Sequence, residues 1–235
     1  MSHVLVGDGH YRGTTQERAQ WTRLVGKLIA DQVSEFSVMG DFFELWIGLR
    51  GVMPRWQSEM LEELEPLKRA GTRIRYVIGN KDYFVEEWNA RSGLFDAVVD
   101  GVEVCPSPQG DLHLAHGDLV NRADRQYRTW RAFSRSWPIR TLARILPRPA
   151  LSALGSKLSK TLESTNKTHK MYFPEDELEA RARELPPGPA TQIYGHFHVH
   201  RELRFDEKRV ITLPFLATEN AGVLVDDHGF HRYEA

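Results

Sequence analysis

FSVMGDFFE (residues 36–44) shows a pattern that recurs along this 235-residue chain: a short apolar run, a glycine and then a polar loop. HVLVGDGH (3–10) and RIRYVIGNKD (73–82) repeat it. The segments between them, 15–31 and 54–70, carry apolar residues at helical spacing. Strands that alternate with helices predict an α/β fold, in which the polar loops gather at the carboxyl ends of the strands.

The same pattern continues beyond these three strands. LHLAHGD (112–118) and TQIYGHFH (191–198) are further strands with polar ends, and residues 202–226 contain short terminal strands. The chain has no internal repeat and no low-complexity stretch, and its length suits one large core. We therefore expect a single domain over residues 1–235.

A basic segment interrupts this pattern. Between Arg122 and Lys170 the chain carries twelve Lys/Arg and two acidic residues, a net +10, whereas the whole chain has a net charge of −1. Apolar residues recur within the segment and indicate helices at roughly 122–137 and 139–163. We expect a basic helical insertion at about 121–172, which either meets an anionic partner or offsets an acidic body.

The composition restricts the cellular setting. The single cysteine, Cys105, excludes an intramolecular disulfide and is typical of a reducing compartment. The N-terminus lacks the basic and long apolar regions of a signal peptide, and no apolar run is long enough to span a membrane. These features predict a cytoplasmic protein.

Seven residues with ligand chemistry follow the predicted strands. Each motif alone is also explained as an ordinary turn or polar strand end, but five of them in series indicate a metal centre. Two carboxylates, four imidazoles and one amide exceed the ligand number of one zinc site and suit two adjacent divalent ions. A nitrogen and oxygen set without sulfur favours Mn, Fe or Zn. The residues are Asp8, His10, Asp41, Asn80, His116, His196 and His198.

The charge of such a centre points to phosphate chemistry. Two divalent ions, two aspartates and one bridging hydroxide leave about one positive charge, which attracts a phosphate. Two ions about 3.5–4 Å apart can also stabilise the attacking and leaving oxygens of an in-line displacement. The sequence therefore predicts a hydrolase that acts on a phosphate ester or a pyrophosphate.

The order D-x-H, GDxxE, GN, H and GHxH resembles that of the calcineurin-like metallophosphoesterases, over residues 4–198. The resemblance implies a four-layer α-β-β-α sandwich with a di-metal centre and an inserted helical lid. It implies that Asp8, His10 and His198 hold one ion, that Asn80, His116 and His196 hold the other, and that Asp41 bridges both. The catalytic group would be Asp41, Asn80, Lys81 and His116.

GDFFELWIG (40–48) is similar to a stretch of the UDP-2,3-diacylglucosamine hydrolases of lipid A biosynthesis. This narrower resemblance implies two ions, most often Mn²⁺, and hydrolysis of the substrate pyrophosphate to UMP and 2,3-diacylglucosamine 1-phosphate. Lys81 stands where that family has arginine, and would hold a phosphate oxygen as a point charge. The implied substrate-binding residues are Asn80, Lys81, Asp124, Tyr127, Arg131, Asn166, Lys170 and His196.

The sequence departs from that family in GDGH (7–10), in LRGVMP (49–54) and in GHFHVH (195–200). A nucleotide, a phosphoprotein or a nucleic acid therefore stays open as the substrate, as does a scaffold member of the fold. His200 lies beyond the last motif and is expected to be an ordinary surface histidine, or one that contacts a metal ligand without binding the metal.

The insertion has two interpretations. Arginines interleaved with apolar residues suit a peripheral contact with the anionic inner face of the cell membrane, with acyl chains on the apolar face. Alternatively, the apolar face packs on the body and the arginines are solvated. Stacking on nucleic acid is less favoured, and no protein partner is implied.

Overall fold

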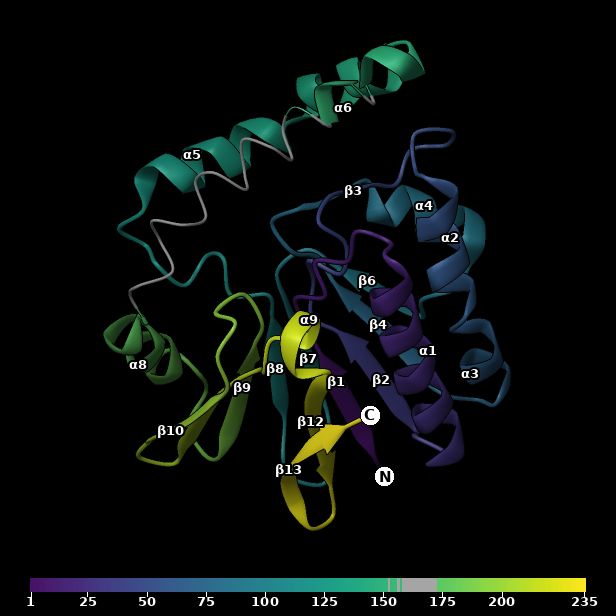
Figure 1. Cartoon of the computed structure of the whole chain (residues 1–235). Coiled ribbons are helices and arrows are strands. Elements are labelled where there is room, and N and C mark those ends of the chain that lie inside the picture. Colours follow the sequence, from purple (N-terminus) through teal and green to yellow (C-terminus); the bar gives the residue numbers. More distant parts are fainter. Residues whose placement is uncertain (152, 156, 158–172) are drawn as a thin grey trace.

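The computed structural model describes residues 1–151, 153–155, 157 and 173–235. Two β-sheets lie face to face (Figure 1). The first has the order β13-β12-β1-β2-β4-β6, and the second β10-β11-β9-β8-β7. The strands of the first sheet are β1 (His3–Val6), β2 (Glu35–Val38), β4 (Arg73–Val77), β6 (Ala97–Val99), β12 (Ala221–Asp226) and β13 (Gly229–Glu234). Those of the second are β7 (Val102–Cys105), β8 (Leu112–Ala115), β9 (Ala190–Tyr194), β10 (Arg201–Phe205) and β11 (Lys208–Thr212).

Helices cover the outer face of each sheet. Four of them pack on the first sheet, and α8 (Glu175–Arg183) packs on the second. Alternate residues of β1 show the layering, because Val4 and Val6 join the core under the helices while Leu5 joins the core between the sheets. The predicted four-layer α-β-β-α sandwich is confirmed. The four helices are α1 (Thr15–Ala30), α2 (Arg55–Glu62), α3 (Glu65–Arg69) and α4 (Val85–Ser92).

The strand register brings the polar loops together. Strands β1, β2 and β4 are neighbouring parallel strands, with Val6 opposite Val38 and Val38 opposite Tyr76. Strands β8 and β9 are parallel in the other sheet, with Ala115 opposite Tyr194. Each of these strands is followed within a few residues by a predicted metal ligand. The loops therefore converge at one end of the two sheets.

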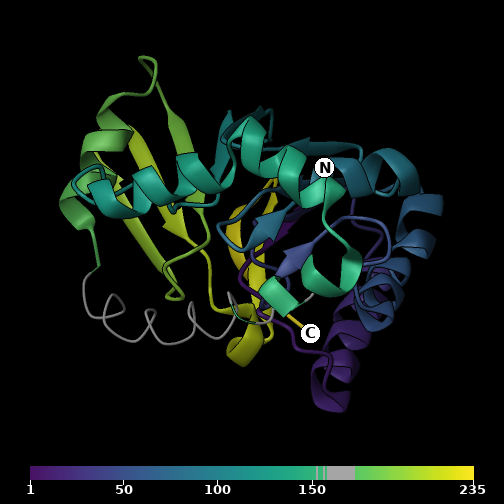
Figure 2. The same ribbon diagram turned by 90° about the horizontal axis from the view of Figure 1, so that it is seen from above.

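Two helices of the basic segment lie across this end of the sheets (Figures 1 and 2). They are α5 (Arg125–Ser134) and α6 (Trp137–Ile145), and Pro138 stands in the first turn of α6. The second predicted helix is interrupted at Pro147, after which residues 148–151, 153–155 and 157 are again helical. Proline cannot donate a backbone hydrogen bond inside a helix, so both divisions follow from the sequence. The remainder of the predicted helix, up to residue 163, lies outside the described residues.

The prediction of one helix over 54–70 was wrong, because this segment forms two helices, α2 and α3. Pro66 occupies the first turn of α3, and its ring would clash with the carbonyl group of Glu62 in a continuous helix. Several short elements were not predicted: β3 (Trp46–Ile47), β5 (Asp82–Tyr83), β6, β7, α4, α8, α9 (Leu216–Glu219) and β13. Within the residues described, no helix combines the length and the apolar character that a membrane span requires.

Candidate metal centre

The loops that carry the predicted ligands turn sharply at the ligands themselves. Five of the seven have positive φ angles although none is glycine, a conformation that costs free energy and concentrates at functional sites. The angles are 58° at Asp8, 44° at His10, 51° at Asp41, 66° at His196 and 56° at His198.

Glycines let these loops approach one another. A Cβ atom on Gly79 would lie 2.3 Å from Asp41 Oδ1, and one on Gly195 would lie 2.8 Å from Asp8 Oδ2. Both distances are shorter than van der Waals contact, so a side chain there would displace a carboxylate. The glycine in the GN and GH motifs is therefore required by the packing of the neighbouring ligand.

Asp8, His10 and His198 form one half of the site. The Nε2 atoms of the two histidines are 3.1 Å apart, and Asp8 Oδ1 lies 3.7 Å from His10 Nε2 and 3.3 Å from His198 Nε2. Asp8 Oδ1 is buried and has no hydrogen-bond partner among the residues that the structure describes. Two nitrogens and an unsatisfied carboxylate oxygen that face one point fit a divalent cation.

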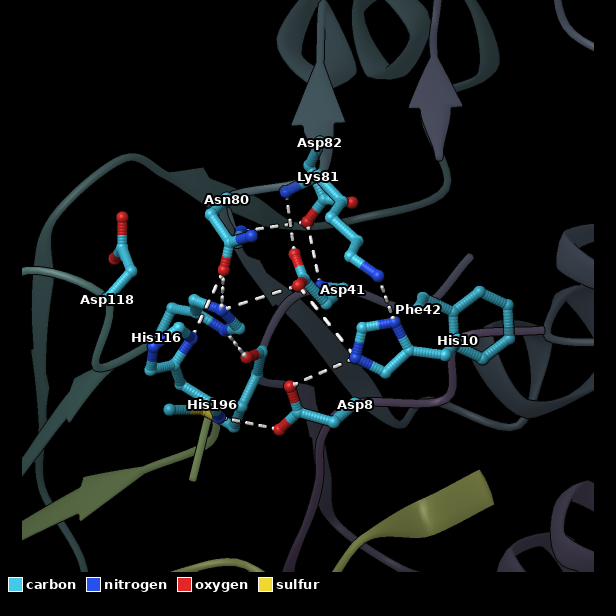
Figure 3. Close-up of polar contacts among 12 residues, drawn as sticks. Asp8, His10, Asp41, Phe42, Asn80, Lys81, Asp82, His116, Asp118 and His196 are labelled. Carbon is cyan, nitrogen blue, oxygen red and sulfur yellow. Dashed lines mark hydrogen bonds and ion pairs between the residues drawn. The ribbon is translucent and has the colours of Figure 1, made fainter. Parts of the chain in front are cut away.

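Asn80, His116 and His196 form the other half (Figure 3). Asn80 Oδ1 lies 3.1 Å from His116 Nε2 and 3.1 Å from His196 Nδ1. His116 Nδ1 donates to the carbonyl oxygen of Met39 over 2.7 Å. That hydrogen bond leaves Nε2 as the ring nitrogen with a lone pair for a metal.

Asp41 lies between the two halves (Figure 3). Its Oδ2 is 4.0 Å from His10 Nε2 and 3.7 Å from His116 Nε2, while its Oδ1 accepts from the backbone N–H of Lys81 over 2.8 Å. The structure thus brings all seven predicted ligands together. His200 is exposed and separate from them, because its Nδ1 donates to the carbonyl oxygen of Thr212 over 2.8 Å.

Burial and neighbouring charges shift the pKa values of these groups in different directions. Burial lowers the pKa of His10 and of His196 to about 4, so both rings are neutral at pH 7 and can act as ligands. Burial also raises the pKa of Asp41, with Asp82 and Asp8 adding to the effect. Although burial opposes it, Asp41 and Asp8 raise the pKa of His116 to about 9. The ring of His116 must therefore lose a proton when a cation binds its Nε2.

Lys81 is buried behind His10, with 2% of its surface exposed. Its Nζ lies 2.7 Å from Glu44 Oε1 and 2.9 Å from His10 Nδ1. The expected contact of Lys81 with a phosphate oxygen does not match this position, because the ammonium group is already paired. The geometry favours a role in holding Glu44, whose Oε2 lies 3.7 Å from His10 Nδ1. Glu44, the last residue of GDxxE, was not among the predicted site residues.

Asp82 was also missed, although it ends the GNKD motif. It is fully buried, and its Oδ2 accepts from the backbone N–H groups of Asp41 (3.0 Å) and Gly79 (2.8 Å) and from the hydroxyl of Tyr76 (2.8 Å). One carboxylate oxygen thus joins the loops that carry Asp41 and Asn80.

Three predicted substrate-binding residues have partners within the chain. Asp124 caps α5, since its Oδ1 accepts from the N–H of Tyr127 over 2.8 Å. The hydroxyl of Tyr127 donates to Asp118, and Arg131 Nε donates to the same carboxylate over 2.7 Å. Asp118, in the motif HGD, was not predicted as a site residue. Asn166 and Lys170 lie outside the described residues.

Comparisons with known proteins agree with this geometry. The family model described as calcineurin-like phosphoesterase matches residues 1–200. The UDP-2,3-diacylglucosamine hydrolase of Stutzerimonas stutzeri (strain A1501) is 26% identical over 245 residues, covering 97% of each chain. The enzyme of the same name from Pseudomonas aeruginosa (strain PAO1) is 29% identical over 212 residues, covering 84% of this chain and 82% of its own.

A solved structure of an archaeal phosphodiesterase shares the fold. Its TM-score is 0.54 at 12% sequence identity, and the alignment covers 99% of this chain and 98% of that one. The predicted metal-dependent phosphoesterase is supported by the family match and by residues placed to bind cations. The chain belongs to the calcineurin-like phosphoesterase family.

Proposed function

We propose that this chain is a di-metal enzyme that hydrolyses the pyrophosphate of UDP-2,3-diacylglucosamine to UMP and 2,3-diacylglucosamine 1-phosphate. The main support is the convergence of seven ligands at one end of two sheets, in a chain whose relatives of that name align over 97% of its length.

Asp8, His10 and His198 would hold one ion, Asn80, His116 and His196 the other, and Asp41 would lie between them. Two divalent ions held there would supply a nucleophile at neutral pH and positive charge for the phosphate oxygens. The ligand set of nitrogen and oxygen atoms suits Mn²⁺, Fe or Zn, and the resemblance to the UDP-2,3-diacylglucosamine hydrolases favours Mn²⁺. Asn80, His116 and His196 would also contact the phosphate and orient it.

A cavity of about 360 Å³ beside His116 supports a substrate larger than a phosphate. It lies between the HGD loop, α5 and α8, and Asp118, Arg131 and Arg181 contribute to its wall. Its volume falls in the range of about 300–1,000 Å³ that is usual for sites of small organic ligands.

The orientation of α5 and α6 supports a lipid substrate. Arg131, Arg135, Arg140 and Arg144 all pair with residues of the body. The apolar side chains point outward instead, and among them Trp137 is 75% and Ile145 73% exposed. We propose that this face acts as a lid that receives acyl chains and contacts the inner face of the cell membrane. The face also includes Trp130, Phe133 and Leu142.

The decisive experiment is mass analysis of the products of UDP-2,3-diacylglucosamine incubated with the protein and Mn²⁺. UMP and the diacylated sugar phosphate are expected, with much slower hydrolysis of a UDP-sugar that lacks acyl chains. Equal hydrolysis of both substrates would contradict the lipid assignment.

Asp41→Ala and His116→Ala should lower turnover at least about 10³-fold, because each removes a ligand from the centre. The matched control is His200→Ala, which should retain most of the activity, since His200 lies outside the ligand cluster. Full activity of Asp41→Ala would refute the catalytic assignment.

A further inference from the structure

Arg131 of α5 and Arg135, the residue that follows its last turn, point toward the loops that carry the candidate metal ligands. Arg131 and Arg135 are one helical turn apart, and their side chains are only 15% and 12% exposed. Arg135 Nη2 lies 2.6 Å from the carbonyl oxygen of Gly79 and 3.1 Å from that of Asp82. These two carbonyl groups flank Asn80 and Lys81, so Arg135 closes the loop that presents Asn80.

Arg131 makes the equivalent contact with the second loop. Its Nε donates to Asp118 Oδ2 over 2.7 Å, and Asp118 is two residues from His116. The carboxylate of Asp100, in the turn between β6 and β7, joins the two arginines. It lies 2.5 Å from Arg131 Nη2 and 3.2 Å from Arg135 Nη1.

These contacts belong to one side of the metal centre. No hydrogen bond or ion pair between described residues joins α5 to Asp8, His10 or His198. A guanidinium group binds several acceptors in a fixed plane, which a single-atom donor such as lysine cannot reproduce. Without it, two carbonyl groups and one carboxylate near Asn80 and His116 would lose charge-assisted partners.

We infer that Arg131 and Arg135 are positioning residues that make the binding of one of the two ions depend on α5. They hold Asn80 and His116 at the spacing the cation needs, whereas no hydrogen bond or ion pair between described residues links either arginine to Asp8, His10 or His198. The inference rests on the division of ligands given under the proposed function, but on no assumption about the substrate. By this inference, the basic segment helps to form the metal site as well as covering it.

The test measures Mn²⁺ affinity without substrate, in two backgrounds that each disable one half of the centre. In His198→Ala the half formed by Asn80, His116 and His196 remains. There, Arg135→Met should weaken Mn²⁺ binding about 10–100-fold, as is usual when a residue that orients a ligand is lost. In His196→Ala the half formed by Asp8, His10 and His198 remains, and Arg135→Met should weaken its Mn²⁺ binding far less, because Arg135 makes no direct contact with these three residues.

Arg128→Met is the matched control, because Arg128 is an exposed arginine of the same helix. It should leave the affinity unchanged in both backgrounds. Arg135→Lys tests whether any loss of binding comes from misfolding, because it keeps the positive charge but lacks the planar guanidinium group. It should weaken binding in the His198→Ala background while keeping the unfolding temperature of its parent. Equal weakening in both backgrounds, or none in His198→Ala, would overturn the inference. Because no substrate is used, failure of the lipid assignment would leave this result intact.

Discussion

Asp8, His10 and Asp41 are held in a left-handed backbone conformation that aspartate and histidine rarely adopt. Residues of this kind cost about 1–3 kcal/mol each and persist only where the surroundings impose them. Here the surroundings are the carboxyl ends of β1 and β2, which point the three side chains at one another. The strain is consistent with selection for the metal centre, not for local stability.

The convergence of the seven candidate ligands could be predicted from the sequence, because each follows a short apolar strand in a fixed motif. The interaction partners of the long basic side chains could not be predicted. Lys81 pairs with Glu44 and Arg131 with Asp118, and neither partner is identified by periodicity. A lysine or arginine near a motif can reach either the substrate or the body, and only the three-dimensional structure distinguishes the two.

His3 gives a prediction about pH. It lies between the sheets, with Nε2 2.8 Å from Ser37 Oγ. Burial, and then the charge of Arg75, lower its pKa from 6.5 to about 3. Between these values the unfolded chain binds a proton that the folded chain does not, so the free energy of unfolding falls as the pH falls through this window.

Between pH 7 and pH 5, the free energy of unfolding should fall by roughly 2 kcal/mol because of His3. Urea denaturation at the two pH values measures it, because His3→Gln should lose less stability than the unaltered protein over this interval. Losses from carboxylates are common to both proteins and cancel in the comparison. His228→Gln, at an exposed histidine, should behave as the unaltered protein. Parallel losses in His3→Gln and the unaltered protein would contradict the prediction.

The helices and strands with clear periodicity were predictable. Helix α1 also has a sequence signal at its start, since Thr14 and Glu17 form a capping box. Strands of two residues such as β3 and β5 carry no periodicity at all, and they form because their loops lie side by side. The face that α5 and α6 turn inward was equally unpredictable, because the acidic partners of their arginines come from distant segments.

Two arginines of helix α6 pair with α4, and Ala143 packs on the apolar cluster that includes Phe84. Arg140 Nη2 lies 3.3 Å from Glu87 Oε1, Arg144 pairs with the same carboxylate, and the Arg140 guanidinium lies 4.9 Å from the centre of the Phe84 ring. Because these groups are partly exposed, the pairs together contribute about 1 kcal/mol.

Glu87→Gln should therefore loosen α6 locally. Hydrogen exchange of residues 137–145 should become roughly fivefold faster, which corresponds to about 1 kcal/mol. Exchange in β1 and β2 should stay unchanged. Glu65→Gln, at an exposed glutamate of α3, is the control and should leave residues 137–145 as they are. Unchanged exchange of this segment in Glu87→Gln would show that apolar contacts alone hold α6.

At the scale of the whole molecule, part of the positive charge of the basic segment is paired with acidic residues elsewhere in the chain. The basic segment meets Asp100, Asp118, Glu87 and Glu184 of the acidic body. The reading in which the basic segment offsets an acidic body is therefore supported for these residues, and contact with an anionic partner stays a proposal.

The metal centre should also contribute to global stability. Asp8, Asp41 and Asp82 are buried within one region, and Asp82 and Asp8 both raise the pKa of Asp41. Cations that bind only the folded chain relieve this repulsion and stabilise it by mass action, by about 2.7 kcal/mol at a concentration one hundred times the dissociation constant. For a chain of this size, that stabilisation corresponds to a rise in unfolding temperature of roughly 5–10 °C.

Thermal unfolding with Mn²⁺ and then with excess EDTA measures this rise, and the chelator should reverse it. His116→Ala should reduce the response, whereas His228→Ala should retain it in full. An unfolding temperature that is the same with Mn²⁺ and with EDTA would show that these residues do not hold a cation in the folded protein.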